Sequence, residues 1–263
     1  MLYDRGYIEL TEQETKEYNL RKERMSQKEG IEPEDILEFP EIFFRHESLF
    51  PNYMLPISEL QINDRTRSIL NEFTVILDNI NSNERDILNF VKENKAYFII
   101  ASLFKYYRFG HHIAFAFPEF ELPPNYRVDY LLVGKSSYGF EFVFVELEKP
   151  YKDITTSDGN LGTTFRKGLK QIEEWETWIE SNFHHLRLLF EKYLGKHRTL
   201  TKEFLVLDTT RIHYVVVAGR RSDFNDTTYR IARKMKKNNN TQILHYDNLI
   251  DSALDILKNG NYV

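Results

Sequence analysis

Three acidic residues, Asp129, Glu146 and Glu148, lie in or next to two segments rich in Val, Leu, Phe and Tyr. These segments, Arg127–Val133 and Phe140–Leu147, have the composition of β-strands. Turn-forming residues separate them, so the sequence predicts a β-hairpin with carboxylates on both strands. Carboxylates grouped in this way are suited to binding a hard cation and to general base chemistry.

The position of the turn decides whether these carboxylates meet. The loop 134–139 contains two glycines and two serines. If the turn is centred between Ser137 and Tyr138, Asp129 lies opposite Glu146, with β-carbons about 4.5–5.5 Å apart. Strand alternation then returns the residue two positions after Glu146 to the same face. A turn shifted by one residue would instead send Asp129 to the other face.

The predicted arrangement has an electrostatic cost that a cation would remove. Apolar residues surround the acidic positions, and ionised carboxylates that are buried without partners are too costly to persist. Mg²⁺ binds one or two carboxylates together with water and phosphate oxygens. The pattern therefore predicts a divalent-metal site at Asp129, Glu146 and Glu148. The alternative is a solvated sheet end, where the acids pair with Lys149 or Arg127.

Composition limits the remaining chemistry and the class of protein. The 263 residues include no cysteine, which excludes disulfides, thiolate catalysis and cysteine zinc sites. A hydrophobic content of 41% is ordinary for a folded protein, and the length allows one large domain or one domain with an appendage. The first twenty residues lack the apolar core of a signal peptide, and no apolar stretch is as long as a membrane span. We therefore expect a cytoplasmic protein without a membrane partner.

Hydrophobic spacing predicts an α/β fold with a mixed sheet flanked by helices. Helices are expected where apolar residues recur every three or four positions, at 69–80, 84–95, 161–179, 227–237 and from 247 onward. Beyond the hairpin, further strands are expected at Phe204–Leu207, Ile212–Ala218 and Gln242–Tyr246. Two more apolar segments, Tyr97–Phe104 and Ile113–Phe117, precede the hairpin.

The first 58 residues are expected to form a mostly helical and irregular appendage. Thr11 and Glu14 have the spacing of a capping box, so a charged helix should follow them. Prolines at positions 33, 40, 51 and 56 then interrupt the segment. Its apolar residues, including Phe39 and Phe50, indicate packing on the main body or on a second subunit. We divide the chain into an appendage for assembly or regulation, 1–81, and a main domain, 82–263.

Basic residues are concentrated in one part of the chain. The whole sequence has 35 Lys and Arg against 40 Asp and Glu, but residues 186–237 have 13 against 5. Such asymmetry favours a polyanionic partner, although cations can also simply solvate a surface. Arg230 and Lys234 on the predicted basic helix are candidates for phosphate contacts. Arg220 and Arg221 follow a predicted strand and are candidates because a guanidinium group suits phosphate geometry.

Several short motifs together resemble those of a known family of enzymes. They are Pro118–Pro124 (PEFELPP), Tyr126–Tyr130 (YRVDY), Val145–Pro150 (VELEKP), Gln171–Trp178 (QIEEWETW) and Gly219–Arg221 (GRR). The combination resembles the PD-(D/E)xK nuclease superfamily and, within it, most closely the nuclease domain of the Shedu anti-phage defence proteins. The likeness covers roughly residues 82–252 and leaves the N-terminal third uncovered.

The resemblance implies a restriction-endonuclease-like core with a metal site for Mg²⁺ or Mn²⁺. Asp129 and Glu146 would bind the metal, together with the backbone carbonyl of Leu147. Two positions after the glutamate the family usually has a lysine that orients the attacking water, but this sequence has Glu148 there and Lys149 next. The identity of the water-activating group, Glu148 or Lys149, therefore stays open.

The resemblance also implies a role for Gln171, whose amide would donate to a metal-bound water or to phosphate. Of the acidic residues elsewhere, Glu84, Glu93 and Glu119 are candidates for an accessory ligand. The implied function is hydrolysis of phosphodiester bonds in DNA by a metal-dependent endonuclease, within a homo-oligomer that acts in anti-phage defence. The main alternative is a nuclease fold that has lost catalysis and serves as a nucleic-acid sensor or assembly scaffold. A third possibility is that the acids are solvated and the chain binds only protein.

Overall fold

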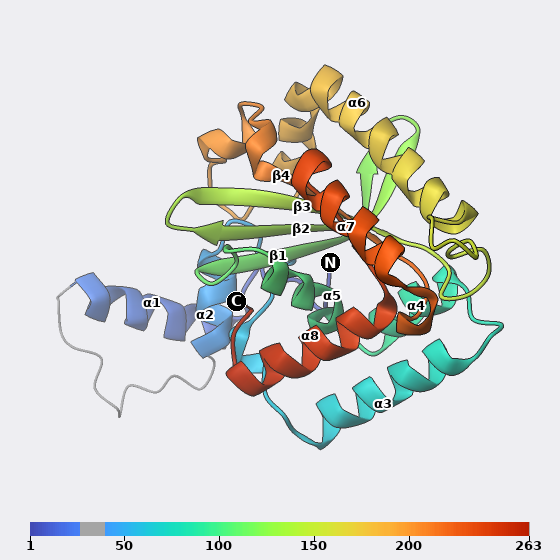
Figure 1. The fold of residues 1–263 in the computed structure, drawn as a ribbon. Coiled ribbons are helices and arrows are strands. Elements are labelled where there is room, and N and C mark those ends of the chain that lie inside the picture. Colours follow the sequence, from blue (N-terminus) through green and yellow to red (C-terminus); the bar gives the residue numbers. More distant parts are fainter. Residues whose placement is uncertain (27–39, 263) are drawn as a thin grey trace.

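A five-stranded mixed sheet forms the centre of the protein (Figure 1), in a computed structural model that describes residues 1–26 and 40–262. The strands are β1 (Ile113–Leu122), β2 (Tyr126–Ser136), β3 (Gly139–Leu147), β4 (Ile212–Val217) and β5 (Thr241–Leu244), and they lie side by side in this order. The pairs β1–β2 and β2–β3 are antiparallel, whereas the pairs β3–β4 and β4–β5 are parallel. The predicted α/β fold with a mixed sheet is confirmed.

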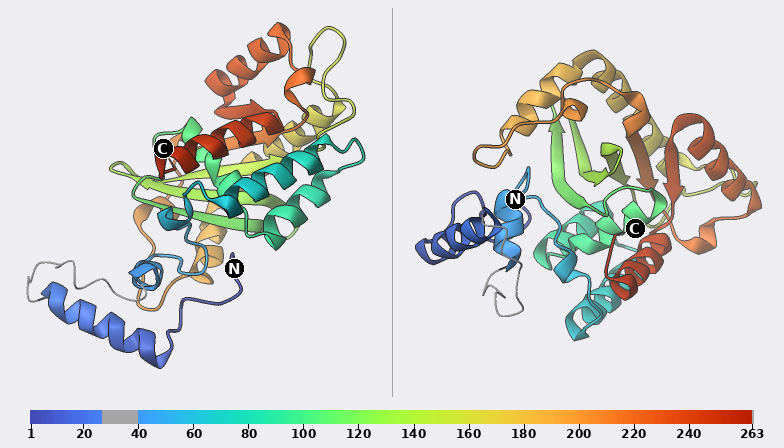
Figure 2. Two further views of the ribbon diagram at one scale, coloured as in Figure 1. Left: turned by 90° about the horizontal axis from the view of Figure 1, so that it is seen from below. Right: turned by 90° about the vertical axis from the view of Figure 1, so that its left-hand side faces the viewer.

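Helices cover both faces of this sheet. The α-helices of the described residues are α1 (Glu12–Ser26), α2 (Pro40–Glu47), α3 (Asp64–Asp78), α4 (Glu84–Glu93), α5 (Tyr97–Ala101), α6 (Thr163–Glu191), α7 (Asp226–Asn239) and α8 (Tyr246–Asn259). Helices α3, α4, α5 and α8 pack on one face, and α6 and α7 lie on the other (Figure 1). The segment before α3 lies at one side of the sheet, with α1 projecting outward (Figure 2).

Strand alternation on β3 divides the interior into two apolar cores. Val143 and Val145 point into the core shared with α3, α4, α5 and α8. Phe142 and Phe144 point into the core shared with α6 and α7. Because the strand is buried on both faces, a carboxylate anywhere near its end has little water around it.

The hairpin has the predicted register. Tyr130 pairs with Val145, and the ladder continues without a shift to the turn, where Ser136 pairs with Gly139. The strands are longer than expected because the turn is confined to two residues. Gly139 has a φ of 104°, a conformation that glycine adopts without steric cost.

The N-terminal segment packs against the main body, which is one of the two locations that the sequence predicted for it. Tyr53 accepts a backbone hydrogen bond from Ala116 at 2.9 Å, and Leu55 donates one to Ala114 at 2.9 Å. The predicted capping box is confirmed, since the backbone N–H of Thr11 donates to the Glu14 carboxylate at 2.8 Å and the Thr11 hydroxyl accepts in return. Positions 33 and 39 lie outside the described residues.

Two apolar segments differ from a simple strand pattern. The predicted strand Phe204–Leu207 is wrong, because the chain forms a 3₁₀ turn at Lys202–Phe204 and buries only its phenylalanine. Leu205 and Val206 are 43% and 64% exposed, so these apolar side chains do not form the buried face of a strand. The segment from Tyr97 is helical, while the next apolar segment is β1.

The helices of the described residues are all too short or too polar to span a membrane.

Candidate active site

The predicted acidic residues gather at one edge of the sheet, where β3 ends beside β4 and β2 begins. The β2–β3 ladder stops at Tyr130 and Val145. Beyond this point the Asp129 carboxylate replaces a backbone acceptor, because its Oδ2 accepts a hydrogen bond of 2.7 Å from the Leu147 backbone N–H. The β1–β2 pairing also skips this position, and Glu119 on β1 has a left-handed φ of 49°. Asp129 therefore lies at a local irregularity that points its carboxylate toward the end of β3.

Glu146 is only 2% exposed, and among the described residues its carboxylate has no hydrogen-bond donor. Burial raises its pKa well above the usual range, and the nearby Asp129 raises it further. Burial likewise raises the pKa of Asp129, against the lowering effect of the Leu147 N–H. The effect of Asp129 on Glu146 indicates that the two carboxyl groups lie close together, although the β2–β3 ladder ends at Tyr130 and Val145 and does not pair their backbones.

Glu148 is the third member of the group and has an ionic partner from a different element. Its side chain is 2% exposed, and Lys167 on α6 reaches it from the outside. The Lys167 Nζ lies 3.1 Å from Oε2 and 2.9 Å from Oε1. Burial raises the pKa of Glu148 even so, and the ammonium offsets only part of this shift. We call Asp129, Glu146 and Glu148 the carboxylate cluster.

The close approach of α6 to the carboxylate cluster depends on Gly168. A Cβ at this position would lie 2.8 Å from Val216 and 3.3 Å from the Cγ of Glu148. One turn further along the helix, Gln171 lies on the same side. Its Oε1 is buried and accepts no hydrogen bond among the described residues, so the predicted position of this amide near the site is compatible with a polar ligand.

Two of the predicted accessory residues lie in this neighbourhood: Glu119 lines a small hollow together with Asp129, and Glu84 approaches Lys167. Glu84 begins α4, and its Oε2 lies 3.9 Å from the Lys167 Nζ. Glu84 also contributes to the raised pKa of both Asp129 and Glu146. Glu119 pairs instead with Arg85 at 3.2 Å.

The carboxylate cluster fits a hard cation by its chemistry. Its donors are the carboxylate oxygens of two buried glutamates and a half-buried aspartate, its acidic groups outnumber its single ammonium group, and Glu146 is without a donor in the described chain. In residues 1–26 and 40–262, however, no three acidic or histidine side chains already have positions that would hold a metal ion. Binding would thus require these side chains to draw together.

Lys149 lies outside this arrangement. Its side chain is exposed, and its backbone carbonyl accepts a hydrogen bond of 3.1 Å from the Gly219 N–H. The ammonium that contacts Glu148 belongs to Lys167, which the sequence analysis did not select. A signal was present, because Lys167 precedes Gln171 by four residues and so shares its face of a helix.

Arg220 and Arg221, the two predicted phosphate clamps, both have acidic partners in the structure. Arg220 forms ion pairs with Asp78 at 2.7 Å and with Asp247 at 3.0 Å. It also donates to the carbonyl of Leu77 at 2.7 Å. Arg221 pairs with an acidic residue of α8. These contacts give Arg220 a structural role, and phosphate binding by either arginine stays a prediction.

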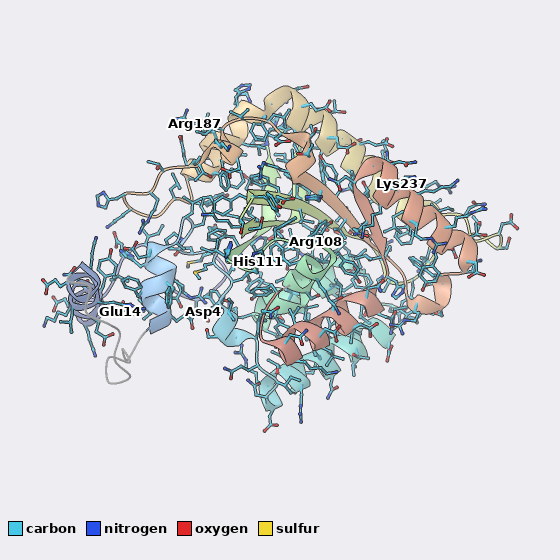
Figure 3. The ribbon with its side chains drawn as sticks, turned by 60° about the vertical axis from the view of Figure 1, so that its left-hand side comes forward. Asp4, Glu14, Arg108, His111, Arg187 and Lys237 are labelled. Carbon is cyan, nitrogen blue, oxygen red and sulfur yellow. The ribbon has the colours of Figure 1, made fainter. Side chains whose placement is uncertain are left out.

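Helix α7 presents several unpaired basic residues of the predicted basic segment. Four exposed cations recur at helical spacing along one side: Arg230, Arg233, Lys234 and Lys237. No acidic side chain of the described chain forms an ion pair with any of them, and we call them the α7 stripe. Figure 3 labels Lys237 on this helix and Arg187 on α6. By contrast, Arg187 pairs with Glu191 at 2.7 Å.

The N-terminus of α7 is connected to the loop that leads from the carboxylate cluster to α6. The buried hydroxyl of Thr228 donates to the carbonyl of Gly159 at 2.8 Å. Thr155 in the same loop donates to the carbonyl of Asp223, just before the helix, at 2.8 Å. These contacts fix the N-terminal end of α7 to the loop that follows the carboxylate cluster.

The mixed sheet and its acidic edge define an α/β protein with a candidate site for a cation and a polyanion. Comparison with protein families identifies its relatives: residues 81–250 match the family described as Shedu protein SduA, C-terminal. Because the match covers more than half of the chain, the protein belongs to the Shedu family, which associates it with anti-phage defence. None of the curated proteins compared with the chain matches it.

Proposed function

We propose that the protein is a divalent-metal-dependent endonuclease that hydrolyses phosphodiester bonds in DNA during anti-phage defence. The observation that carries the proposal is the carboxylate cluster, where the half-buried Asp129 and the buried Glu146 have too few positive partners. The proposal includes a restriction-endonuclease-like core of the PD-(D/E)xK type. It also includes assembly into a homo-oligomer and action in the cytoplasm.

Each residue of the site has a distinct part in this proposal. Asp129 and Glu146 would hold Mg²⁺ or Mn²⁺, with the Leu147 carbonyl as a further oxygen donor. The metal supplies Lewis-acid activation of water and of the scissile phosphate. Glu148, already hydrogen-bonded to Lys167, is placed to accept a proton from the attacking water. Gln171 has a free buried oxygen with which to orient a polar ligand.

The α7 stripe supports a nucleic-acid partner. Unpaired cations on one helix face attract phosphate without reading sequence, and each contact makes binding more sensitive to salt. We expect the double substitution Arg230→Gln/Lys234→Gln to reduce the salt slope of duplex DNA binding by roughly two, which fluorescence anisotropy would measure. Arg187→Gln with Lys170→Gln removes two paired cations and serves as the matched control. An equal loss in both proteins would argue against the α7 stripe as the binding surface.

A plasmid assay tests the nuclease itself. Supercoiled DNA is incubated with the protein and Mg²⁺, Mn²⁺ or EDTA, for the wild type and for Asp129→Asn. We expect metal-dependent nicking or cleavage that EDTA stops and that the substitution reduces by at least about a thousandfold, since metal activation contributes several kcal/mol. Equal cleavage by Asp129→Asn would point to a contaminating nuclease and remove the support for this site.

The second candidate is a nuclease fold that binds nucleic acid without cutting it. Two observations favour it: Glu148 replaces the usual lysine, and the described carboxylates are not yet arranged to hold a metal ion. This candidate predicts salt-sensitive DNA binding through the α7 stripe with no cleavage under any metal. The same plasmid and anisotropy experiments therefore distinguish the two functions.

A further inference from the structure

We propose that Lys167 is a tethered counter-ion of the carboxylate cluster, and that a divalent cation must displace its ammonium group in order to bind. The inference rests on the proposed metal site and goes beyond it, because it concerns what neutralises the acids before any metal arrives. A metal held by Asp129 and Glu146 would lie within the electrostatic influence of the Lys167 ammonium, which already lowers the pKa of both acids.

The Lys167 ammonium donates a hydrogen bond to one oxygen of Glu148 and lies close to the other, which has no hydrogen-bond partner among the described residues. The Nζ lies 2.9 Å from one carboxylate oxygen and 3.1 Å from the other, with Glu84 as a second acidic neighbour at 3.9 Å. Glu148 is 2% exposed, whereas the Lys167 side chain is 60% exposed. The lysine therefore extends inward from the surface, and a modest rotation of its flexible chain would return the ammonium to water.

The close packing of α6 on the sheet brings the Lys167 ammonium near Glu148. Gly168 allows α6 to approach Val216 and Glu148 more closely than any residue with a Cβ would allow. The other cations near the site are engaged elsewhere or exposed: Arg85 pairs with Glu119, and Lys149 points to solvent. Among the described residues, Lys167 is thus the cation that forms an ion pair within the carboxylate cluster.

Electrostatic repulsion decides whether the Lys167 ammonium strengthens or weakens the binding of a divalent ion. A divalent ion that enters beside a fixed ammonium meets electrostatic repulsion, which offsets part of its attraction to the carboxylates. Moving the ammonium outward removes this repulsion and leaves a free positive group at the rim of the site, where it can contact a phosphate. Lys167 would then act first as a placeholder for the metal and afterwards as a contact for the substrate.

Calorimetric titration with MnCl₂ at pH 8 tests the inference without relying on activity. We compare the wild type with Lys167→Met, which removes the charge, and with Lys167→Gln, which keeps a hydrogen-bond donor. Lys170→Met is the matched control, because Lys170 lies on the same helix and pairs only with Glu174, at 3.7 Å. We expect both Lys167 variants to bind Mn²⁺ about tenfold more tightly and the control to stay within about twofold of wild type.

The possible failures are distinguishable. Unchanged or weaker Mn²⁺ binding in both Lys167 variants, with clear binding by the wild type, would overturn the counter-ion role and leave the metal site standing. Absence of binding in all four proteins would overturn the metal site and this inference together. Tighter binding in Lys167→Met but not in Lys167→Gln would also contradict it, because the argument depends on charge and not on the loss of a hydrogen bond.

Discussion

Two charged clusters lie at the ends of the neighbouring strands β3 and β4, and they differ in how their charges are balanced. At the end of β4, the guanidinium of Arg220 has two carboxylates, a carbonyl and the Tyr151 hydroxyl around it. At the end of β3, the buried carboxylates have one ammonium group, from Lys167. One cluster is saturated with partners, whereas the other has more acidic groups than cationic partners.

The pKa shifts follow this difference. Although burial opposes it, Arg220 lowers the pKa of Asp247, so the saturated cluster favours its ionised form. In the carboxylate cluster, burial and neighbouring acids raise the pKa of Asp129 and Glu146. A satisfied ion-pair network mainly holds the fold together, whereas an unsatisfied one is where a ligand gains most by binding.

The largest expected effect comes from Glu146→Gln. We expect DNA cleavage to fall by about a thousandfold or more, because a metal ligand is lost, while the metal-free protein becomes no less stable. Plasmid cleavage and chemical denaturation measure the two quantities on the same sample. If the substitution destabilised the metal-free protein by several kcal/mol, the carboxylate cluster would be structural like its neighbour, and the comparison would fail.

Unlike the carboxylate cluster, the saturated cluster around Arg220 should lose stability when one of its charged groups is removed. We expect Arg220→Met to lower the free energy of unfolding by about 3 kcal/mol, because it leaves partly buried acids without their partner. Urea denaturation measures this. Arg221→Met is the control: its pair is more than half exposed on both sides and should contribute well under 1 kcal/mol. Equal effects from the two substitutions would show that burial does not distinguish them.

A smaller effect is expected in the pH dependence of stability. The unfolded chain ionises its carboxyl groups near pH 4–4.5, but the raised pKa of Glu146 keeps its proton bound in the folded protein to higher pH. The folded state then binds more protons, so metal-free stability should fall as pH rises from about 5 through neutrality, by at most about 1.4 kcal/mol per unit for this group. Glu146→Gln should flatten the slope, and an identical slope in both proteins would count against the raised pKa.

Much of the site was predictable because a tight hairpin fixes its own register. A turn centred between Ser137 and Tyr138 determines the pairing of Tyr130 with Val145, and Asp129 then follows directly beyond the end of this ladder, near Glu146. The strand error at Phe204 has a different cause: a short apolar run does not reveal whether a neighbouring strand is free to pair with it.

The role of Lys167 was not predictable from the local pattern. Its contact with Glu148 joins residues from a strand end and a separate helix, and it depends on the packing of α6 at Gly168. The partners of Arg220 show the same limit, since Asp78 is 142 residues away in the sequence. Local periodicity places residues on faces, but tertiary packing decides which charges meet.

The C-terminal end of α3 has a consequence for preparing shorter versions of the protein. The carbonyl of Leu77 accepts hydrogen bonds from Tyr151 at 2.6 Å and from Arg220, and Phe73 and Leu77 belong to the same apolar core as α8. A fragment trimmed to the family-matched region, 81–250, would lose this helix together with most of α8. Tyr151 and Arg220 would lose this acceptor and one face of the sheet would lose part of its cover, so we expect a stable fragment to extend beyond that region at both ends.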